Sequence, residues 1–239
     1  MWAILYTLAT THITFACVSL YLHRGLSHRL FTFHPALEHF FRFWLWLTDG
    51  VVVKEWAAQH RKHHKYTDVQ GDPHSPVLFG INKIAITGFF VTVWHRYRFL
   101  DSDWALEHYG KGTPDDWIEH HIYTPYSRCG LLLLAAIDIL LFGWATGLIV
   151  WAVQIIWVPL WSNSVITGLA HWWGYQHPGS KDNSRNLCPV GIIMVGEELH
   201  NNHHVQPMNP NLRHRWYEFD LGWEYIKFLK FLGLAKVNS

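Results

Sequence analysis

Two histidine motifs, separated by 140 positions, contain the side chains best suited to chemistry in this sequence. They read HRKHH at 60–64 and HNNHH at 200–204. In a helix, positions i, i+3 and i+4 lie on one face, so each motif is expected to aim three imidazoles at a common point. Six converging histidines predict a metal site.

Three further histidines extend this set. His23 and His28 frame the stretch HRGLSH, and His171 follows a long apolar segment. The i, i+5 spacing of His23 and His28 does not place both rings on one face of a regular helix, so a helix here should end or distort between them. The candidate metal ligands are therefore His23, His28, His60, His63, His64, His171, His200, His203 and His204.

Nine imidazoles exceed the needs of a single tetrahedral zinc ion, which takes about four protein ligands. They suit two metal ions with coordination positions left open for oxygen. Imidazole binds Fe, Zn, Cu and Ni, so ligand type alone does not choose the metal.

The composition indicates a membrane protein. Half of the 239 residues are apolar, 16% are aromatic and 15% are charged, against about 25% charged in an ordinary soluble domain. A formal net charge of +1 argues against a nucleic-acid partner, which would require a strongly basic face.

Two apolar regions predict the membrane helices of an all-α fold. Residues 1–22 contain no Lys, Arg, Asp or Glu, and residues 129–170 contain only Asp138. Both are long enough to cross a hydrocarbon core of about 30 Å. The second region should form a hairpin with its turn around Trp144 to Gly147, which gives helices at about 129–146 and 148–170 and three crossings in total.

The remaining segments, 23–128 and 171–239, contain all nineteen Lys and Arg residues. By the positive-inside rule both should face the cytoplasm. We therefore expect one domain, 1–239, in which a membrane helical bundle carries a cytoplasmic helical cap with every histidine motif. Residues 36–53 are expected to form a helix that lies at the membrane interface or packs against the site, broken near Asp49-Gly50.

Five motifs in order carry a family resemblance. They are HRGLSH at 23–28, EWAAQHRKHH at 55–64, DPH at 72–74, AHWWGY at 170–175 and GEELHNNHH at 196–204. This set resembles the membrane fatty acyl desaturases of the stearoyl-CoA, or delta-9, type.

The resemblance implies a di-iron centre held by the nine histidines. Such a centre uses O2 as co-substrate to remove two hydrogens from a saturated acyl chain and leave a cis double bond, which the resemblance places at carbon 9. No haem-binding, flavin-binding or iron–sulfur motif is visible, so a separate electron donor of the cytochrome b5, ferredoxin or rubredoxin type is expected.

The chain departs from the family pattern at two places. Thr167 occupies the position, four residues before His171, at which members usually have an Asn that completes the coordination of one iron. Ala58 and Gln59 stand where animal members have an Arg and an Asp near the coenzyme A headgroup. The substrate can thus be an acyl-CoA, an acyl-lipid or an acyl-carrier-protein chain.

Several neighbours of the ligands are candidates for supporting roles. Asp68 and Glu197 could orient ligand imidazoles, although a solvated charge is an equally good interpretation of Asp68. Trp56, Trp173 and Tyr175 are candidates for the wall of an acyl tunnel. The full set of supporting candidates is Trp56, Asp72, His74, Thr167, Trp173, Tyr175 and Glu198.

Two other functions fit parts of the pattern. A membrane di-iron hydroxylase would use the same ligands and return oxygen to the carbon. A histidine-rich metal transporter would need its ionisable ligands inside membrane helices, whereas these motifs lie outside the apolar spans. The sequence therefore favours desaturation over transport.

Overall fold

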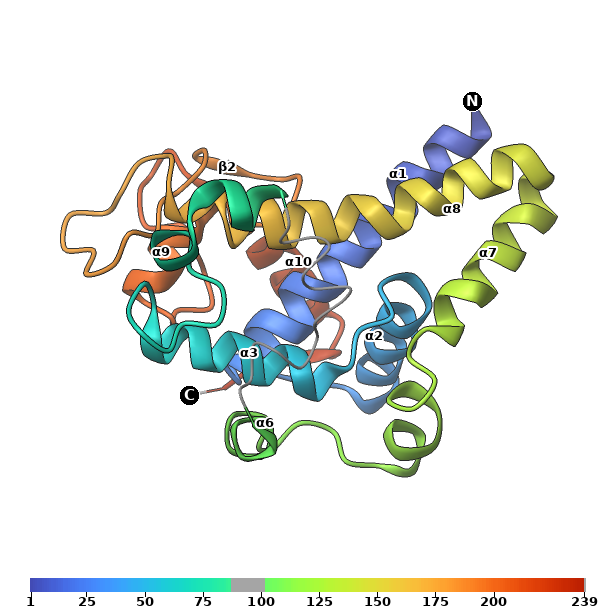
Figure 1. The fold of residues 1–239 in the computed structure, drawn as a ribbon, viewed down its shortest axis with the longest axis horizontal. Coiled ribbons are helices and arrows are strands. Elements are labelled where there is room, and N and C mark those ends of the chain that lie inside the picture. The colour runs from blue at the N-terminus through green and yellow to red at the C-terminus, as the bar shows by residue number, and fades with distance from the viewer. Residues whose placement is uncertain (87–101, 239) are drawn as a thin grey trace.

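Three apolar helices form an arm that projects from a larger helical cap (Figure 1). The computed structural model describes residues 1–86 and 102–238, so residues 87–101 of the predicted cap lie outside the described part. The arm consists of α1 (Trp2–Ala16), α7 (Cys129–Phe142) and α8 (Trp144–Pro159). The N-terminus and the turn between α7 and α8 lie together at its tip (Figure 1).

The hairpin turns at Gly143, slightly before the predicted position. Gly143 has a φ of 76°, a left-handed conformation that glycine adopts without steric cost. Gly147 instead lies inside α8, where an added Cβ would come within 2.6 Å of the backbone of Asp138 and Ile139. Gly147 thus allows α7 and α8 to pack closely, because it has no side chain. The prediction that it belongs to the turn was wrong.

Two of the three predicted crossings have the length and composition of membrane spans. Continuous helical stretches run over Trp2–Ser27 and Trp144–His171. The 14 residues of α7 extend only about 21 Å at 1.5 Å per residue, which is shorter than a hydrocarbon core. The predicted helix at 129–146 is therefore shorter than expected.

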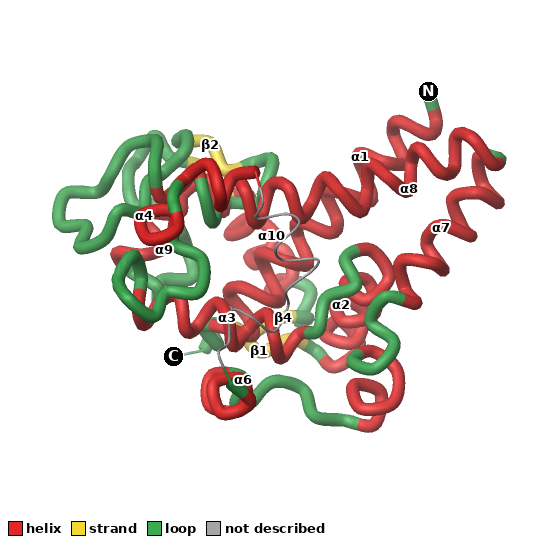
Figure 2. Tube along the Cα trace, in the orientation of Figure 1, coloured by secondary structure: helices red, strands yellow, loops and turns green. Residues whose placement is uncertain are grey.

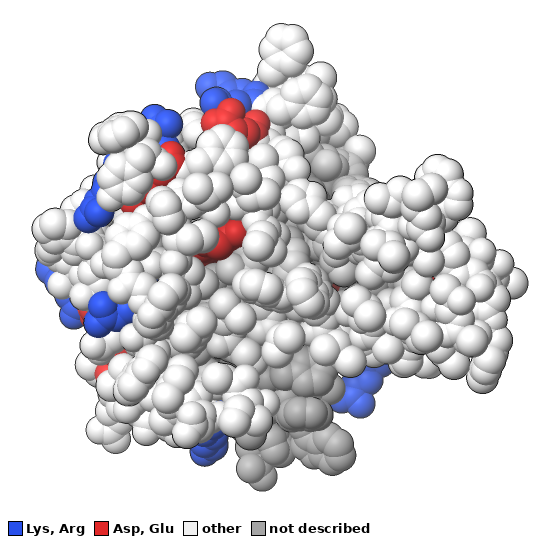
Figure 3. Space-filling view, turned by 90° about the horizontal axis from the view of Figure 1, so that it is seen from above, with Lys and Arg blue, Asp and Glu red and all other residues white. Residues whose placement is uncertain are grey.

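The arm exposes apolar side chains over most of its surface. Ile4, Leu140 and Ile149 are 65%, 86% and 65% exposed. Lys, Arg, Asp and Glu gather over the cap, whereas the end formed by the arm is almost uniformly uncharged (Figure 3). Contiguous exposed apolar surface of this kind is typical of a membrane-facing region.

The helix that begins with α1 changes its winding before it reaches the cap. It continues as a π-helix, η1 (Cys17–Ser27), and the N–H of His28 donates to the carbonyl of His23 at 3.2 Å. An i, i+5 backbone bond of this kind defines the π-helix and brings His23 and His28 to neighbouring positions. The predicted distortion is confirmed.

The cap begins with two helices that follow the predicted pattern. Helix α2 (Pro35–Thr48) ends at Asp49 and Gly50, as predicted, and Gly50 has a φ of 60°. Helix α3 (Val53–Tyr66) then carries the first HxxHH motif. On α2, the buried Arg42 pairs with Asp116 at 2.6 Å and with Glu119 at 2.9 Å, which ties α2 to the segment that leads into α7.

The rest of the cap consists of short elements. The helices among the described residues are α4 (Pro76–Phe79), α6 (Asp103–Tyr109), η2 (Glu119–Tyr123), η3 (Leu160–Ile166), η4 (Leu169–His171), η5 (Glu197–Leu199), α9 (His200–Val205) and α10 (Leu221–Phe231). Helix α3 packs against η1 and α6, and α9 follows η5 directly.

In the part of the chain that the structure describes, two small sheets modify the expected all-α fold (Figure 2). Strand β1 (Phe31–Phe33) pairs antiparallel with β4 (Ala235–Val237). Strand β2 (Val190–Gly191) pairs in parallel with β3 (Phe219–Asp220). The first sheet pairs the C-terminal segment with the stretch of chain that follows His28.

A candidate dinuclear metal centre

All nine predicted ligands lie together in two adjacent clusters. The first cluster contains His23, His28, His60, His64 and His203. The second contains His63, His171, His200 and His204. Within each cluster the candidate ligand nitrogens all lie within 4.8 Å of one another. We call these groups the five-histidine and the four-histidine cluster.

Each HxxHH motif divides its histidines between the clusters, so the expectation of one common point per motif was wrong. On α3, His60 and His64 join the five-histidine cluster while His63 joins the other. The motif of α9 divides in the opposite sense, because its central histidine, His203, is the one that joins the five-histidine cluster. At 3.6 residues per turn, positions i and i+4 lie about 40° apart around the axis, and i+3 lies about 60° to 100° from them.

The ring nitrogens have a spacing that suits metal coordination. Two nitrogens about 2.1 Å from one metal ion and at right angles to each other are about 3.0 Å apart. Pairs of Nε2 atoms lie 2.9 to 3.0 Å apart in His23–His203, His28–His60, His64–His203 and His171–His200.

Two further ring nitrogens point to the same conclusion. The Nε2 atoms of His63 and His204 are buried and have no hydrogen-bond partner among the described residues. A buried polar atom without a partner is costly unless something else binds it. The residues therefore fit two ions that accept imidazole, a group of metals that includes iron.

Carboxylates orient four of the imidazoles. The Nδ1 atoms of three histidines in the four-histidine cluster and one in the other cluster face acidic side chains at 2.6 to 3.1 Å. The pairs are His63–Asp72, His171–Asp68, His204–Asp182 and His23–Glu197. A carboxylate that accepts from Nδ1–H fixes the tautomer and leaves the lone pair of Nε2 free for a metal.

Three of these four carboxylates were candidates from the sequence, and one was missed. Asp72 and Glu197 contact ligand histidines as expected. Asp68, for which a solvated charge was an equally good interpretation, contacts His171. Glu198 does not: its carboxylate accepts from the backbone N–H of Met194 at 2.9 Å. Asp182 was missed because it lies in a loop with no motif, 22 residues before His204.

Burial favours the neutral form of His60, His63, His64 and His200. Burial, reinforced by the neighbouring imidazoles, lowers the pKa of His60, His63 and His200 well below the usual value. The same causes lower the pKa of His64 to about 3. Neutral imidazole is the form that binds metals.

Asp68 is held in its charged form. Burial alone would raise its pKa, but the hydrogen bond and charge of His171, with further donors from Ser75 and Asn183, outweigh burial and keep that pKa below its usual value. The acceptor that Asp68 offers to His171 is therefore a carboxylate.

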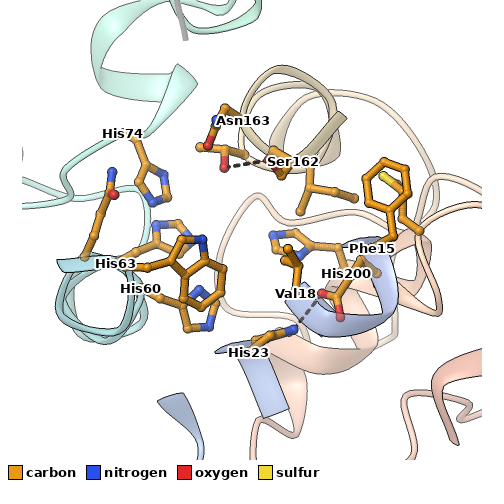
Figure 4. A pocket seen from close by; sticks show the side chains of 15 residues that line it. Phe15, Val18, His23, His60, His63, His74, Ser162, Asn163 and His200 are labelled. Carbon is orange, nitrogen blue, oxygen red and sulfur yellow. Dashed lines mark hydrogen bonds and ion pairs between the residues drawn. The ribbon is translucent and has the colours of Figure 1, made fainter. Parts of the chain in front are cut away.

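A cavity reaches both clusters from the side of the arm (Figure 4). Histidines of both clusters line it, together with apolar side chains from α1, η1, α3, η3 and the loop before η5. The cluster histidines are His23, His60, His63 and His200, and His74 lines the cavity beside them. The apolar lining consists of Phe15, Val18, Trp56, Ile166 and Met194.

The remaining predicted residues have different surroundings. His74 lines the cavity and stacks on His63, with ring centroids 4.3 Å apart. Thr167 also lines the cavity, but its hydroxyl donates to the carbonyl of Ser162 at 3.1 Å. Trp173 and Tyr175 line a separate surface hollow, and Trp173 is 60% exposed. Of the three aromatic candidates for the tunnel, the cavity therefore includes Trp56 alone.

Fold and site together define a class of helical proteins in which apolar helices carry a histidine-rich, dinuclear-type metal site at one end. Comparison with known families identifies the family within this class. Residues 1–228 match the family model described as fatty acid desaturase. The chain belongs to the fatty acid desaturase family.

Similar proteins carry related names. A probable chloroplastic lipid desaturase, ADS3.2, of Arabidopsis thaliana is 33% identical over 92% of this chain and 58% of its own length. An acyl-CoA 5-desaturase, AL21, of Anemone leveillei is 32% identical over 89% and 64%. An sn-2 palmitoyl-lipid 9-desaturase of Nostoc sp. (strain 36) is 32% identical over 98% and 81%. The chain thus spans about three fifths of the length of the first two relatives.

Proposed function

We propose that this protein is an O2-dependent fatty acyl desaturase that introduces a cis double bond into a saturated acyl chain. One observation carries the proposal: the cavity brings an apolar wall and candidate ligands of both histidine clusters to the same space. An acyl chain needs the apolar wall, and oxidation of an unactivated C–H bond needs a redox metal beside it. Family membership supports the same reaction.

The nine histidines would hold two iron ions, five in one cluster and four in the other. When bound, these ions supply the activation of O2 that the reaction requires. The overall change consumes one O2, two electrons and two protons, and it converts a CH2–CH2 unit into CH=CH with release of two water molecules.

The protein's own residues orient the ligands and hold the acyl chain. Asp68, Asp72, Asp182 and Glu197 keep their partner histidines in the tautomer that offers Nε2. The apolar lining removes water from the space in which the methylene groups would lie. His74, stacked on His63, would position that ligand within the cavity wall.

We propose an acyl-lipid or acyl-CoA substrate, because named relatives act on both kinds of chain. The double bond is proposed at carbon 9, as in the name of the Nostoc relative. The proposal places the arm in the membrane and the histidine clusters on the cytoplasmic face, within a single desaturase domain, with a separate protein as electron donor.

The test is analysis of total fatty acids by gas chromatography and mass spectrometry in a host that lacks its own desaturase. We expect a new cis-monounsaturated acid with this chain and none with the variant His63→Ala/His64→Ala, which removes one ligand from each cluster. Hydroxy acids in place of the unsaturated product would show hydroxylation instead. Absence of any product with iron bound and a donor present would refute the proposed reaction.

A further inference from the structure

Two histidines outside the dinuclear centre lie against each other between two loops of the cap. His177 lies in the loop between η4 and β2, and His214 lies in the loop between α9 and β3. Their ring centroids are 5.4 Å apart, and their ring planes are perpendicular, at 90°. In the four-histidine cluster, the rings of His171 and His200 are 5.0 Å apart at 71°. We call His177 and His214 the outer histidine pair, and its geometry is close to that of a candidate ligand pair.

This spacing suits two imidazoles that share one metal ion. An ion about 2.1 Å from a coordinating ring nitrogen lies about 3.2 Å from the centroid of that ring. With the two rings at a tetrahedral angle around the ion, their centroids are about 5.2 Å apart. The observed separation of 5.4 Å is close to that value. The separation of the rings therefore permits a shared ion.

The ring nitrogens of the outer histidine pair are buried but unpaired. Nδ1 of His177 and both ring nitrogens of His214 have no hydrogen-bond partner in the part of the chain that the structure describes. A neutral imidazole carries one N–H donor and one acceptor, so His214 leaves both unused. An unpaired buried polar group is costly unless something else binds it. The same condition marks Nε2 of His63 and His204 in the dinuclear centre.

The charge state of the pair also favours a metal. Burial, followed by the neighbouring His177, lowers the pKa of His214, and the opposing attraction of Glu218 does not reverse this. Neutral imidazole is the form that coordinates metal ions. Arg215 follows His214 directly, and its charge should hold the affinity for a cation to a moderate level.

Both loops hold helix α9, which carries the second HxxHH motif. The backbone N–H of His177 donates to Oδ1 of Asn201 at 2.6 Å. In the other loop, the carbonyl of Leu212 and the carboxylate of Glu218 accept from Nδ2 of Asn202 at 2.9 and 2.7 Å. These two asparagines are the residues between the ligand histidines of α9. An ion between the loops would therefore join the two segments that position α9.

We propose that the outer histidine pair binds one divalent cation of the zinc type, separate from the dinuclear centre, and that this ion joins the two loops that position α9. His177 and His214 would supply two of its four ligands, and water would supply the others. Zinc accepts imidazole and has no redox chemistry of its own, so the role of the ion is structural. The site does not depend on the proposed reaction, and its test requires no acyl substrate.

The experiment compares two variants that each replace two histidines. His177→Gln/His214→Gln removes the outer histidine pair. His108→Gln/His120→Gln, the control, removes two exposed histidines of α6 and η2. The iron-loaded proteins are titrated anaerobically with Zn2+ by isothermal calorimetry in detergent, and their iron and zinc contents are measured after equilibrium dialysis against Zn2+. Hydrogen exchange with and without Zn2+ reports on the loops that contain His177 and His214.

We expect the parent and the control variant to bind about one zinc ion per chain without loss of iron. Zinc binding should be at least about tenfold weaker in His177→Gln/His214→Gln, because water replaces both imidazoles. Zn2+ should slow amide exchange in both loops of the parent and leave exchange in this variant unchanged, since an ion that binds only the folded state stabilises that state. Equal iron content and circular dichroism in all three proteins would show that the variants are folded.

Equal zinc affinity in the parent and in His177→Gln/His214→Gln would overturn the proposal, and so would the absence of zinc binding by the parent. Zinc uptake matched by an equal loss of iron would assign the binding to the dinuclear centre instead and would also overturn it. If the double variant does not fold, the single variant His214→Gln is tested by the same criteria. A change in desaturase activity is not among these readouts, so failure of the proposed reaction is detected separately by product analysis.

Discussion

The two histidine clusters differ in how firmly the protein orients them. In the four-histidine cluster, three of four imidazoles face a carboxylate, contributed by Asp68, Asp72 and Asp182. In the five-histidine cluster, Glu197 provides one such contact, to His23. The cluster with fewer ligands thus has more oriented ligands. Fixed tautomers and ring positions compensate for the imidazole ligand that this cluster lacks relative to the other. The side chains lose less conformational freedom when a metal binds, because they are already ordered.

Ligand removal should give the largest effect and should distinguish the clusters. His63→Ala/His64→Ala takes one ligand from each cluster, and His60→Ala/His64→Ala takes two from the five-histidine cluster. We expect both to lower product formation at least about 100-fold, since losing a direct ligand costs more than losing its supporting residue. Elemental analysis should show that the second variant retains about one iron per chain. Equal iron content in both would contradict the separation into two sites.

Loss of an orienting carboxylate should matter more in the four-histidine cluster. Asp72→Asn weakens the acceptor for His63, and Glu197→Gln does the same for His23. We expect iron affinity to fall about 10- to 100-fold for Asp72→Asn. The loss should be smaller for Glu197→Gln, because four other imidazoles of that cluster still bind the iron. Anaerobic Fe2+ titration measures both. A larger loss with Glu197→Gln would reverse the comparison.

Acid should destabilise the metal-free protein. The folded state holds the pKa of His60, His63, His64 and His200 below the value of about 6.5 that a histidine has in an unfolded chain. The unfolded chain therefore binds more protons below that pH, and stability falls as the pH decreases. We expect a lower melting temperature at pH 5 than at pH 7 in detergent, with a flatter profile in His60→Ala/His64→Ala. Equal melting temperatures at both pH values would exclude this coupling.

The smallest effect is expected at Thr167. Its hydroxyl bonds to the carbonyl of Ser162, and no ligand histidine is among its hydrogen-bond partners in the described part of the chain. We expect Thr167→Val to keep both iron ions and to change product formation by no more than about twofold. Loss of one iron on elemental analysis would instead make Thr167 a ligand of the cavity-facing site.

The sequence predicted which histidines form the metal centre, but it did not predict how they are arranged. Histidine type, order and helical spacing were enough to select nine residues that the structure brings together. The division of each HxxHH motif was not predicted, because a shared helix face was treated as one direction although its members differ by up to about 100°. Predicting it required the position of the opposing helix.

Loop residues were the least predictable part of the site. Asp182 reaches His204 from a loop, and Tyr175 turns to Glu218 instead of the cavity, with its hydroxyl donating at 2.8 Å. Neither segment has a period that fixes where its side chains point. The turn at Gly143 was misplaced for a related reason, since two glycines lay within reach and only packing distinguished them.

The π-helical winding between His23 and His28 makes the length of this segment as important as its composition. Removing one residue there would favour a return to α-helical winding, which advances about 100° per residue, and would turn one histidine out of the cluster. Substitutions at surrounding apolar positions change packing only locally. Variation among natural or engineered versions of this chain should therefore preserve the number of residues in this segment more strictly than their identity.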